Sequence, residues 1–245
     1  MCGIVGYSGK TGSLDVLLEG LHKLEYRGYD SAGVALSYPD GIRVAKAQGR
    51  LSALEEKLAG LHLPDSGCGI GHTRWATHGA PSDVNSHPHS AARVSLVHNG
   101  IIENYAQLRE YLVRKGYEFC SETDSEVLVK LMDHNYQGDP LDAMRRTLAQ
   151  VRGSYGLAIL FRDRPGVIYG ARKDSPLIVG CGEGENFLAS DIPALLRHTR
   201  TYIALEEGDM VELKPDSIRL FDRLGQPVER PQMEAQWEME AAEKG

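Results

Sequence analysis

The feature that most constrains the fold is a run of short strand-like segments in the last third of the sequence. After Gly153, apolar stretches of four or five residues alternate with turn-forming residues. They span residues 157–161, 167–171, 177–180, 187–190, 202–205, 210–213 and 218–221. One predicted helix, 192–198, interrupts them. So many consecutive strands exclude a regular alternation of strands and helices in this part of the chain.

Predicted helices gather instead in the first two-thirds of the sequence. Residues 14–24 place five leucines on one helical face: Leu14, Leu17, Leu18, Leu21 and Leu24. Further helices are predicted at 51–58, 104–115, 123–132 and 140–151, and strands at 3–8, 32–37, 42–47, 69–73 and 94–98. Strands at both ends with helices grouped between them predict an α+β fold built in layers.

Composition excludes several classes of protein. The formal net charge is -7 over 245 residues, so no basic surface of the kind that binds nucleic acid is expected. No apolar run approaches the roughly 20 residues of a membrane span, and the start lacks the pattern of a signal peptide. The cysteines show no CxxC spacing: Cys2, Cys68, Cys120 and Cys181. We therefore expect a cytoplasmic protein that contacts neither membrane nor nucleic acid.

Cys2 is the first candidate for chemistry. Once Met1 is removed, residue 2 would carry a thiol and a free α-amine together. Their reference pKa values are about 8.5 for the thiol and 7.7–8.0 for the amine, so the amine can serve as the base for its own thiol near neutral pH. A cysteine at position 2 is weak evidence alone, but Gly3 and Gly6 beside it would let backbone approach closely.

Eight motifs now identify a family resemblance. They are MCGIVGY, LEYRGYDSAG, HTRWATHG, VNSHPH, VHNGIIENY, SETDSEV, VRGSYGLAI and GENFLASD. Together, and in this order, they resemble the glutaminase domain of glucosamine-6-phosphate synthases over nearly the whole chain. The resemblance implies an N-terminal-nucleophile hydrolase fold, which is a four-layer αββα sandwich with two mainly antiparallel sheets.

The resemblance also implies a role for each matched residue. Cys2 would attack the side-chain amide of L-glutamine, and Asn99 and Gly100 would form the oxyanion hole. Arg74 would grip the α-carboxylate, and Asp124, in the first turn of a capped helix, would bind the α-ammonium. Asn-Gly is also a typical hairpin turn, and both interpretations can hold together.

Loop residues complete the implied substrate site. These are Trp75, Thr77 and His78 in a lid that would exclude water, Arg27 and Gly28 in a second loop beside Tyr29, and His87 of VNSHPH. The histidines at 72, 78, 87, 89 and 98 match no metal-binding spacing, so hydrogen bonding is the preferred interpretation. Gly180, Gly182 and Gly184 lack the GxGxxG spacing of a nucleotide loop. No metal and no cofactor are expected.

The predicted organisation is a glutaminase domain over residues 1–229 and a linker over residues 230–245. The linker would lead to a C-terminal sugar-phosphate isomerase half that this chain lacks. In the family, that half uses the ammonia to make glucosamine 6-phosphate from fructose 6-phosphate, and it is the main site of subunit pairing, which is compatible with a monomer here. Two alternatives stay open: a glutaminase serving another acceptor, and a non-catalytic glutamine-binding module.

Overall fold

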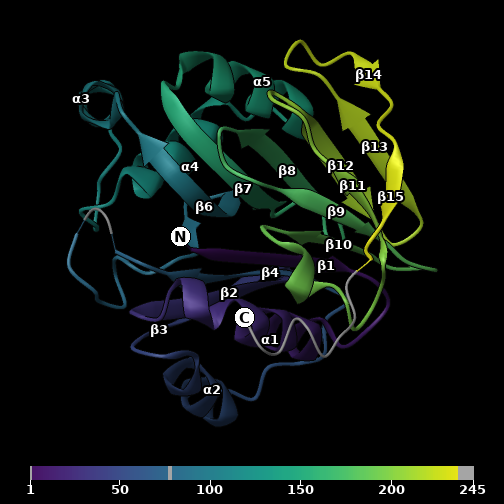
Figure 1. Ribbon diagram of the computed structural model, residues 1–245. Helices are drawn as coiled ribbons and strands as arrows, with labels where there is room; N and C mark the ends of the chain where they lie inside the picture. The colour runs from purple at the N-terminus through teal and green to yellow at the C-terminus, as the bar shows by residue number, and fades with distance from the viewer. Residues whose placement is uncertain (1, 77–78, 237–245) are drawn as a thin grey trace.

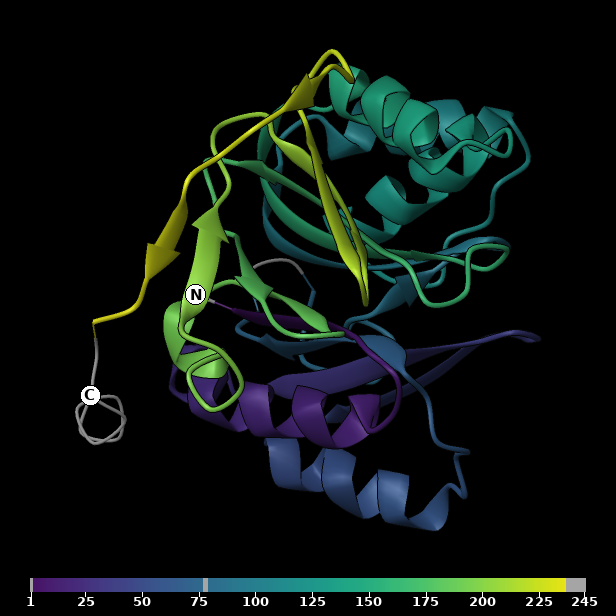
Figure 2. The same ribbon diagram turned by 90° about the vertical axis from the view of Figure 1, so that its right-hand side faces the viewer.

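The computed structural model describes residues 2–76 and 79–236. Within these residues the chain forms two stacked β-sheets, one of eight strands and one of seven, with helices covering both outer faces. Figure 1 shows α1 and α2 below the first sheet and α3–α5 around the second. The turned view separates the four layers clearly (Figure 2). The α+β prediction and the αββα arrangement are confirmed.

Neighbouring strands in both sheets are antiparallel. In spatial order the first sheet holds β15 (Gln232–Glu234), β11 (Thr201–Ala204), β9 (Ile178–Cys181), β10 (Asn186–Ala189), β1 (Gly3–Ser8), β4 (Cys68–Arg74), β2 (Ser31–Tyr38) and β3 (Gly41–Gln48). The second holds β14 (Pro227–Val228), β13 (Ser217–Phe221), β12 (Met210–Lys214), β8 (Ile168–Lys173), β7 (Gly153–Phe161), β6 (Val94–Ile102) and β5 (His89–Ser90).

The helices follow the predicted order. They are α1 (Ser13–Leu24), α2 (Leu51–Gly60), α3 (Tyr105–Arg114), α4 (Asp124–Asn135) and α5 (Pro140–Gln150), with short 3-10 turns η1 (Glu25–Arg27) and η2 (Ile192–Ala194). None of them, within the part of the chain described, is long and apolar enough to cross a bilayer.

Strand alternation sorts the apolar side chains into layers. In β1, Ile4 packs between the sheets, whereas Val5 faces the layer of α1 and α2. Both faces are covered, so β1 is buried throughout, which explains its unbroken apolar sequence. In β4, glycines occupy the helix side, where a Cβ on Gly69 or Gly71 would lie 2.9 Å from Leu17 or Leu21 of α1. The missing side chains let α1 approach the sheet closely.

The start of α4 departs slightly from the predicted capping box. Thr123 Oγ1 accepts the N–H of Glu126 at 3.2 Å, as expected of an N-cap. The Glu126 carboxylate does not return to the cap residue. It accepts the N–H groups of Cys120 at 3.0 Å and Ser121 at 2.6 Å, so it orders the chain that leads into the helix.

Other differences from the sequence prediction are local. Asn99 and Gly100 lie inside β6, paired with Gly156 and Tyr155, so the hairpin-turn interpretation is wrong. The predicted helix at 192–198 is only the turn η2, because the N–H groups of residues 198 and 199 both bond back to Leu195 O and the chain turns into β11. The two-residue and three-residue strands β5, β14 and β15 are too short to give a periodic signal.

The layer between the sheets should contribute strongly to stability. Leu160 is fully buried there, so Leu160→Ala should lower the free energy of unfolding by about 2–5 kcal/mol. The matched control is Leu224→Ala, since Leu224 is 67% exposed and should change stability by less than about 0.5 kcal/mol. Urea unfolding of both variants tests this difference, and equal losses would contradict the assignment of the layer.

Candidate active site

A cavity of about 310 Å³ opens at one end of the layer between the sheets. Its walls come from the start of β1, the end of β4, the middle of β6 and the first turn of α4. The lining residues are Cys2, Arg27, Arg74, Trp75, His87, His98, Asn99, Gly100, Ile101, Thr123, Asp124, Ser125, Ser154, Ser175, Pro176 and Ser190.

Strand alternation explains why these side chains meet. Ile70 of β4 and Val97 of β6 belong to the apolar layer between the sheets, and so does Ile4 of β1. Side chains two residues apart on a strand point to the same face. His72 and Asn99 therefore point inward two residues after Ile70 and Val97, and Cys2 does so two residues before Ile4. The polar site is therefore the continuation of the apolar layer at its open end.

The Cys2 thiol lies against the backbone of Trp75. The Trp75 N–H donates to Sγ at 3.2 Å, and Sγ lies 3.6 Å from the Trp75 carbonyl oxygen. Burial raises the pKa of the Cys2 thiol, and nearby Asp30 raises it further, although the Trp75 N–H and Arg74 oppose them. The thiol therefore needs a base to become a nucleophile at neutral pH.

The Asn99 side chain bridges Cys2 and a buried histidine. Asn99 Nδ2 donates to the Cys2 carbonyl oxygen at 2.8 Å, and Oδ1 lies 2.9 Å from His72 Nε2. An amide nitrogen has two hydrogens, so one remains beyond the bond to Cys2. This places a polar N–H donor on the residue next to Gly100 in the cavity wall.

Gly100 cannot be replaced without strain. Its φ angle is 132°, and an added Cβ would lie 2.2 Å from the Ser154 carbonyl oxygen on the neighbouring strand β7. The Ser154 hydroxyl also accepts the Ile101 N–H at 3.2 Å. Glycine thus allows β6 and β7 to approach closely where they form the cavity wall.

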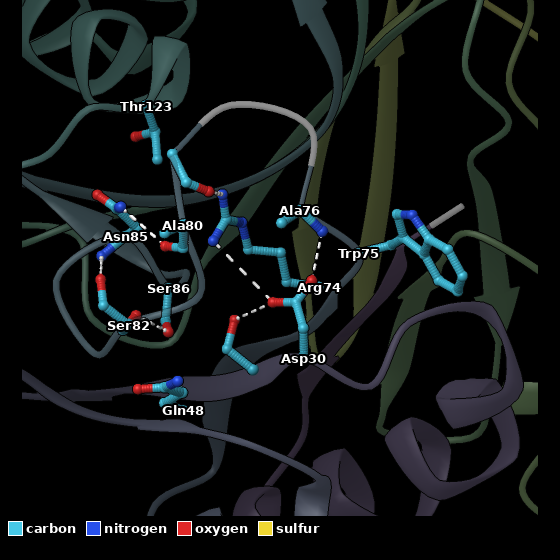
Figure 3. A network of polar contacts seen from close by, with 12 residues as sticks. Asp30, Gln48, Arg74, Trp75, Ala76, Ala80, Ser82, Asn85, Ser86 and Thr123 are labelled. Atoms are coloured by element: carbon cyan, nitrogen blue, oxygen red, sulfur yellow. Dashed lines mark hydrogen bonds and ion pairs between the residues drawn. The ribbon is translucent and has the colours of Figure 1, made fainter.

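Arg74 is buried at the end of β4 (Figure 3). Its Nη2 donates to the Gly79 carbonyl oxygen at 3.0 Å, and its Nη1 lies 4.0 Å from Asp30 Oδ1. The other Asp30 oxygen accepts the N–H of Ala76. Figure 3 shows Trp75 turned away from this network. The Gly79 carbonyl and the Asp30 carboxylate therefore hold the guanidinium in place at the cavity.

The predicted second loop approaches the same backbone. A Cβ on Gly28 would lie 2.7–2.9 Å from atoms of Arg74 and Trp75, so only glycine fits between them. Arg27 pairs with Asp191. Trp75 is half exposed and meets Tyr29 edge-on, with ring centroids 5.4 Å apart. Gly28 thus supports the cavity without lining it, whereas Thr77 and His78 fall outside the described residues.

Asp124 begins α4 and is 4% exposed. Its Oδ2 accepts the Ile102 N–H at 2.7 Å, which ties the helix start to the end of β6. Asp124 lines the cavity, and the positive end of the helix dipole lies beside it. A negatively charged group thus stands in the same cavity as the Arg74 cation.

Four of the histidines are buried near one another. His72, His87, His89 and His98 are all buried, and desolvation lowers the pKa of each ring, to about 3 for His72. Ser125 Oγ and Thr123 Oγ1 bond to His98 and His89 at 2.8 and 3.0 Å. Across residues 2–76 and 79–236, no three His, Cys, Asp or Glu side chains could together hold a metal ion.

The structure adds residues that the sequence analysis did not assign to the substrate site. His72, Asp30, Ser154 and Ser190 contact the predicted residues or line the cavity. Asp30, Ser154 and Ser190 stand inside quoted motifs, and His72 opens HTRWATHG. Their position in these motifs was the only available signal, because each contact depends on strands far apart in the sequence.

Comparison with known proteins identifies the family. The sequence model described as a glutamine amidotransferase domain matches residues 72–197, just over half of the chain. The chain is a member of this glutamine amidotransferase family.

Longer relatives match the amidotransferase domain throughout. Glutamine–fructose-6-phosphate aminotransferase (isomerizing) of Thermus thermophilus is 52% identical over 247 aligned positions, which cover all of this chain and 41% of the relative. The protein with the same name from Clostridium perfringens is 53% identical and is covered to 40%. The chain therefore spans about two-fifths of the length of these relatives.

A solved structure supports the fold of the amidotransferase domain. The glutamine phosphoribosylpyrophosphate amidotransferase of B. subtilis, determined with ADP and GMP, superposes with a TM-score of 0.78. The two share 24% identity, and the match covers 91% of this chain and 49% of that one. At this identity the likeness concerns the fold, which is the predicted N-terminal-nucleophile hydrolase fold.

The cost of a steric clash with Ser154 at position 100 can be measured separately from the cost of the positive φ angle. Gly100→Ala should lower the free energy of unfolding of the amidotransferase domain by at least about 2 kcal/mol more than Gly116→Ala. Gly116 also has a positive φ of 89°, but an added Cβ there meets no atom of the described residues within 4 Å. It therefore shows the cost of the angle alone, about 1–2 kcal/mol. Urea unfolding measures both, and equal losses would contradict the close approach of β6 and β7.

Proposed function

We propose that this amidotransferase domain hydrolyses L-glutamine to glutamate and ammonia through a glutamyl thioester on Cys2. The observation that carries the proposal is the contact between Asn99 and Cys2. The amide nitrogen that would stabilise an oxyanion is bonded to the residue that bears the thiol, at 2.8 Å. Nucleophile and oxyanion donor are therefore fixed relative to each other before substrate arrives.

The base would be the α-amine of Cys2 after removal of Met1. Burial raises the pKa of the thiol, so little thiolate exists at neutral pH without a base. At pH 7, an α-amine with a reference pKa of about 7.7–8.0 is roughly 10–20% unprotonated, and this fraction can accept the thiol proton. It belongs to the same residue, so it reaches the thiol directly or through one water.

The reaction then follows in balanced steps. The amine takes the thiol proton as sulfur bonds to the amide carbon, and the oxygen that gains negative charge is held by Asn99 Nδ2 and the Gly100 N–H. The amine gives its proton to the leaving nitrogen, and the C–N bond breaks to release ammonia. Water, deprotonated by the amine, attacks the thioester carbon. The C–S bond breaks to free glutamate, and the amine returns its proton to the sulfur.

The charged groups of glutamine would meet opposite charges in the cavity. Arg74 supplies a planar guanidinium for the α-carboxylate, and Asp124 supplies a carboxylate for the α-ammonium. Arg27, Gly28, Trp75 and His87 would shape the mouth and wall around them, and Thr77 and His78 would belong to the covering loop. The two opposite charges would select the α-ammonium and α-carboxylate of an amino acid, and the side-chain amide would be recognised at Cys2 and Asn99.

The names of the relatives indicate the use of the ammonia. We propose that the domain serves a glutamine–fructose-6-phosphate aminotransferase, in which a further region receives ammonia and forms glucosamine 6-phosphate. The glutaminase domain would cover residues 1–229. Residues 230–245 would lead toward the further region, with β15 (Gln232–Glu234) still paired to β11 at their start. We also propose that the domain is cytoplasmic and, alone, monomeric.

Steady-state kinetics test the nucleophile and the oxyanion donor. Processed wild-type chain should release glutamate from glutamine, and Cys2→Ala should abolish release. Asn99→Ala should lower kcat by roughly 100- to 1000-fold with little change in KM, because it removes a contact made in the transition state. The matched control is Cys120→Ala, which removes an exposed thiol and should leave activity unchanged.

The same samples separate the alternatives. Calorimetric binding of glutamine without any glutamate release by the processed wild-type chain would contradict the enzyme and support a glutamine-binding module. Release that persists in Cys2→Ala would contradict the thioester.

Substrate analogues test the two charged grips. Arg74→Lys should lower kcat/KM for glutamine by roughly 10- to 100-fold but barely affect 4-aminobutanamide, which has no carboxylate. Asp124→Asn should show the converse pattern with 4-carbamoylbutanoate, which has no ammonium. Measuring both variants with all three substrates is decisive. Equal losses on every substrate would mean that neither charge recognises the group assigned to it.

A further inference from the structure

Behind Asn99 lies a histidine that does not line the cavity. His72 is fully buried in β4, and its ring faces the layer between the sheets. Its Nε2 atom lies 2.9 Å from Asn99 Oδ1. The contact joins the two sheets, because Asn99 belongs to β6 of the opposite sheet.

The partners of the Asn99 amide determine its orientation. The Cys2 carbonyl oxygen can only accept a hydrogen bond, so the atom that faces it at 2.8 Å must be Nδ2. Oδ1 therefore faces His72 and can only accept. The hydrogen of this second bond must come from His72 Nε2, which fixes the tautomer of the ring.

The ring of His72 is itself held in place. It stacks on His87 with centroids 4.1 Å apart and an interplanar angle of 28°. His87 Nδ1 in turn accepts the N–H of His98 at 3.3 Å. Burial lowers the pKa of His72 to about 3. Among the residues that the structure describes, its buried Nδ1 has no hydrogen-bond partner. The ring is thus neutral, with its single N–H directed at Asn99.

We propose that His72 is a positioning residue for the oxyanion hole, holding the Asn99 amide so that its second N–H faces the reacting carbon. This inference rests on the proposed glutaminase function. Without the His72 bond, the Cys2 carbonyl alone would hold the amide, and its plane could turn so that the second N–H no longer faces the reacting carbon. The bond also polarises the amide, since donation to Oδ1 strengthens the Nδ2 donors.

A role through Asn99 differs measurably from a role in packing alone. A packing residue would change stability and substrate binding, whereas His72 should change kcat. His72→Met removes the N–H at similar volume, and His72→Gln restores a nitrogen donor near the Nε2 position. Asn99→Ala and the double variant His72→Met/Asn99→Ala complete a cycle that detects action through the amide.

Glutamine hydrolysis by the processed chain should fall on the order of tenfold in kcat for His72→Met, less than for loss of the donor itself. KM and the rate of Cys2 alkylation by iodoacetamide should stay within about twofold. His72→Gln should recover most of kcat. In the Asn99→Ala background, His72→Met should have no further effect. Additive losses, or a change confined to KM, would overturn the inference.

The activity of the wild type separates the two proposals, and NMR of the histidine rings gives an independent test. If wild type releases no glutamate, the proposed function fails, whereas an active wild type with an unaffected His72→Met defeats only the role of His72. Should the variants unfold, nitrogen NMR of the wild-type rings decides. A neutral Nε2–H tautomer of His72 at pH 6–8 supports the inference, and an Nδ1–H or protonated ring overturns it.

Discussion

The structure depends on the apolar contact between its two sheets. Four fully buried side chains belong to this contact: Ile4, Ile70, Val97 and Leu160. Their packing fixes β1, β4 and β6 relative to one another. Because β1 lies between β10 and β4 and is buried on both faces, the residue before it has a defined position. Cys2 is thus placed by a rigid central strand rather than by a loop.

The site arises where this layer changes from apolar to polar. Inward positions that continue the same strands carry Cys2, His72 and Asn99, and most buried polar atoms are expected to bond to other protein groups. The Asn99 amide bonds to Cys2, which directly precedes β1, and to His72 of β4, and both of these strands belong to the opposite sheet. The buried histidines remain neutral, which suits a site in which Arg74 supplies the positive charge.

The sequence predicted most of the fold. Strand and leucine patterns locate β1 and α1 within one residue, and the capping box locates the start of α4 within one residue, although α4 continues three residues beyond its predicted end. The motif resemblance also predicted four residues of one site, and the structure places all of them in the same cavity: Cys2, Arg74, Asn99 and Asp124. The contacts of His72 and Asp30 could not be predicted, because they depend on the register between distant strands. The strand position of Asn99 was missed because the dipeptide Asn99-Gly100 is typical of a turn. In the structure Gly100 does have a positive φ of 132°, but it lies within the strand.

The central claim is that β1 presents a residue that is both nucleophile and base. The most direct measurement compares glutamine hydrolysis by a chain beginning at Cys2, released from a cleavable fusion, with a chain that retains Met1. The account predicts hydrolysis that is at least on the order of 100-fold slower when Met1 remains, since the α-amine of Cys2 is then an amide. Equal rates from the two chains would contradict the claim and require a different base.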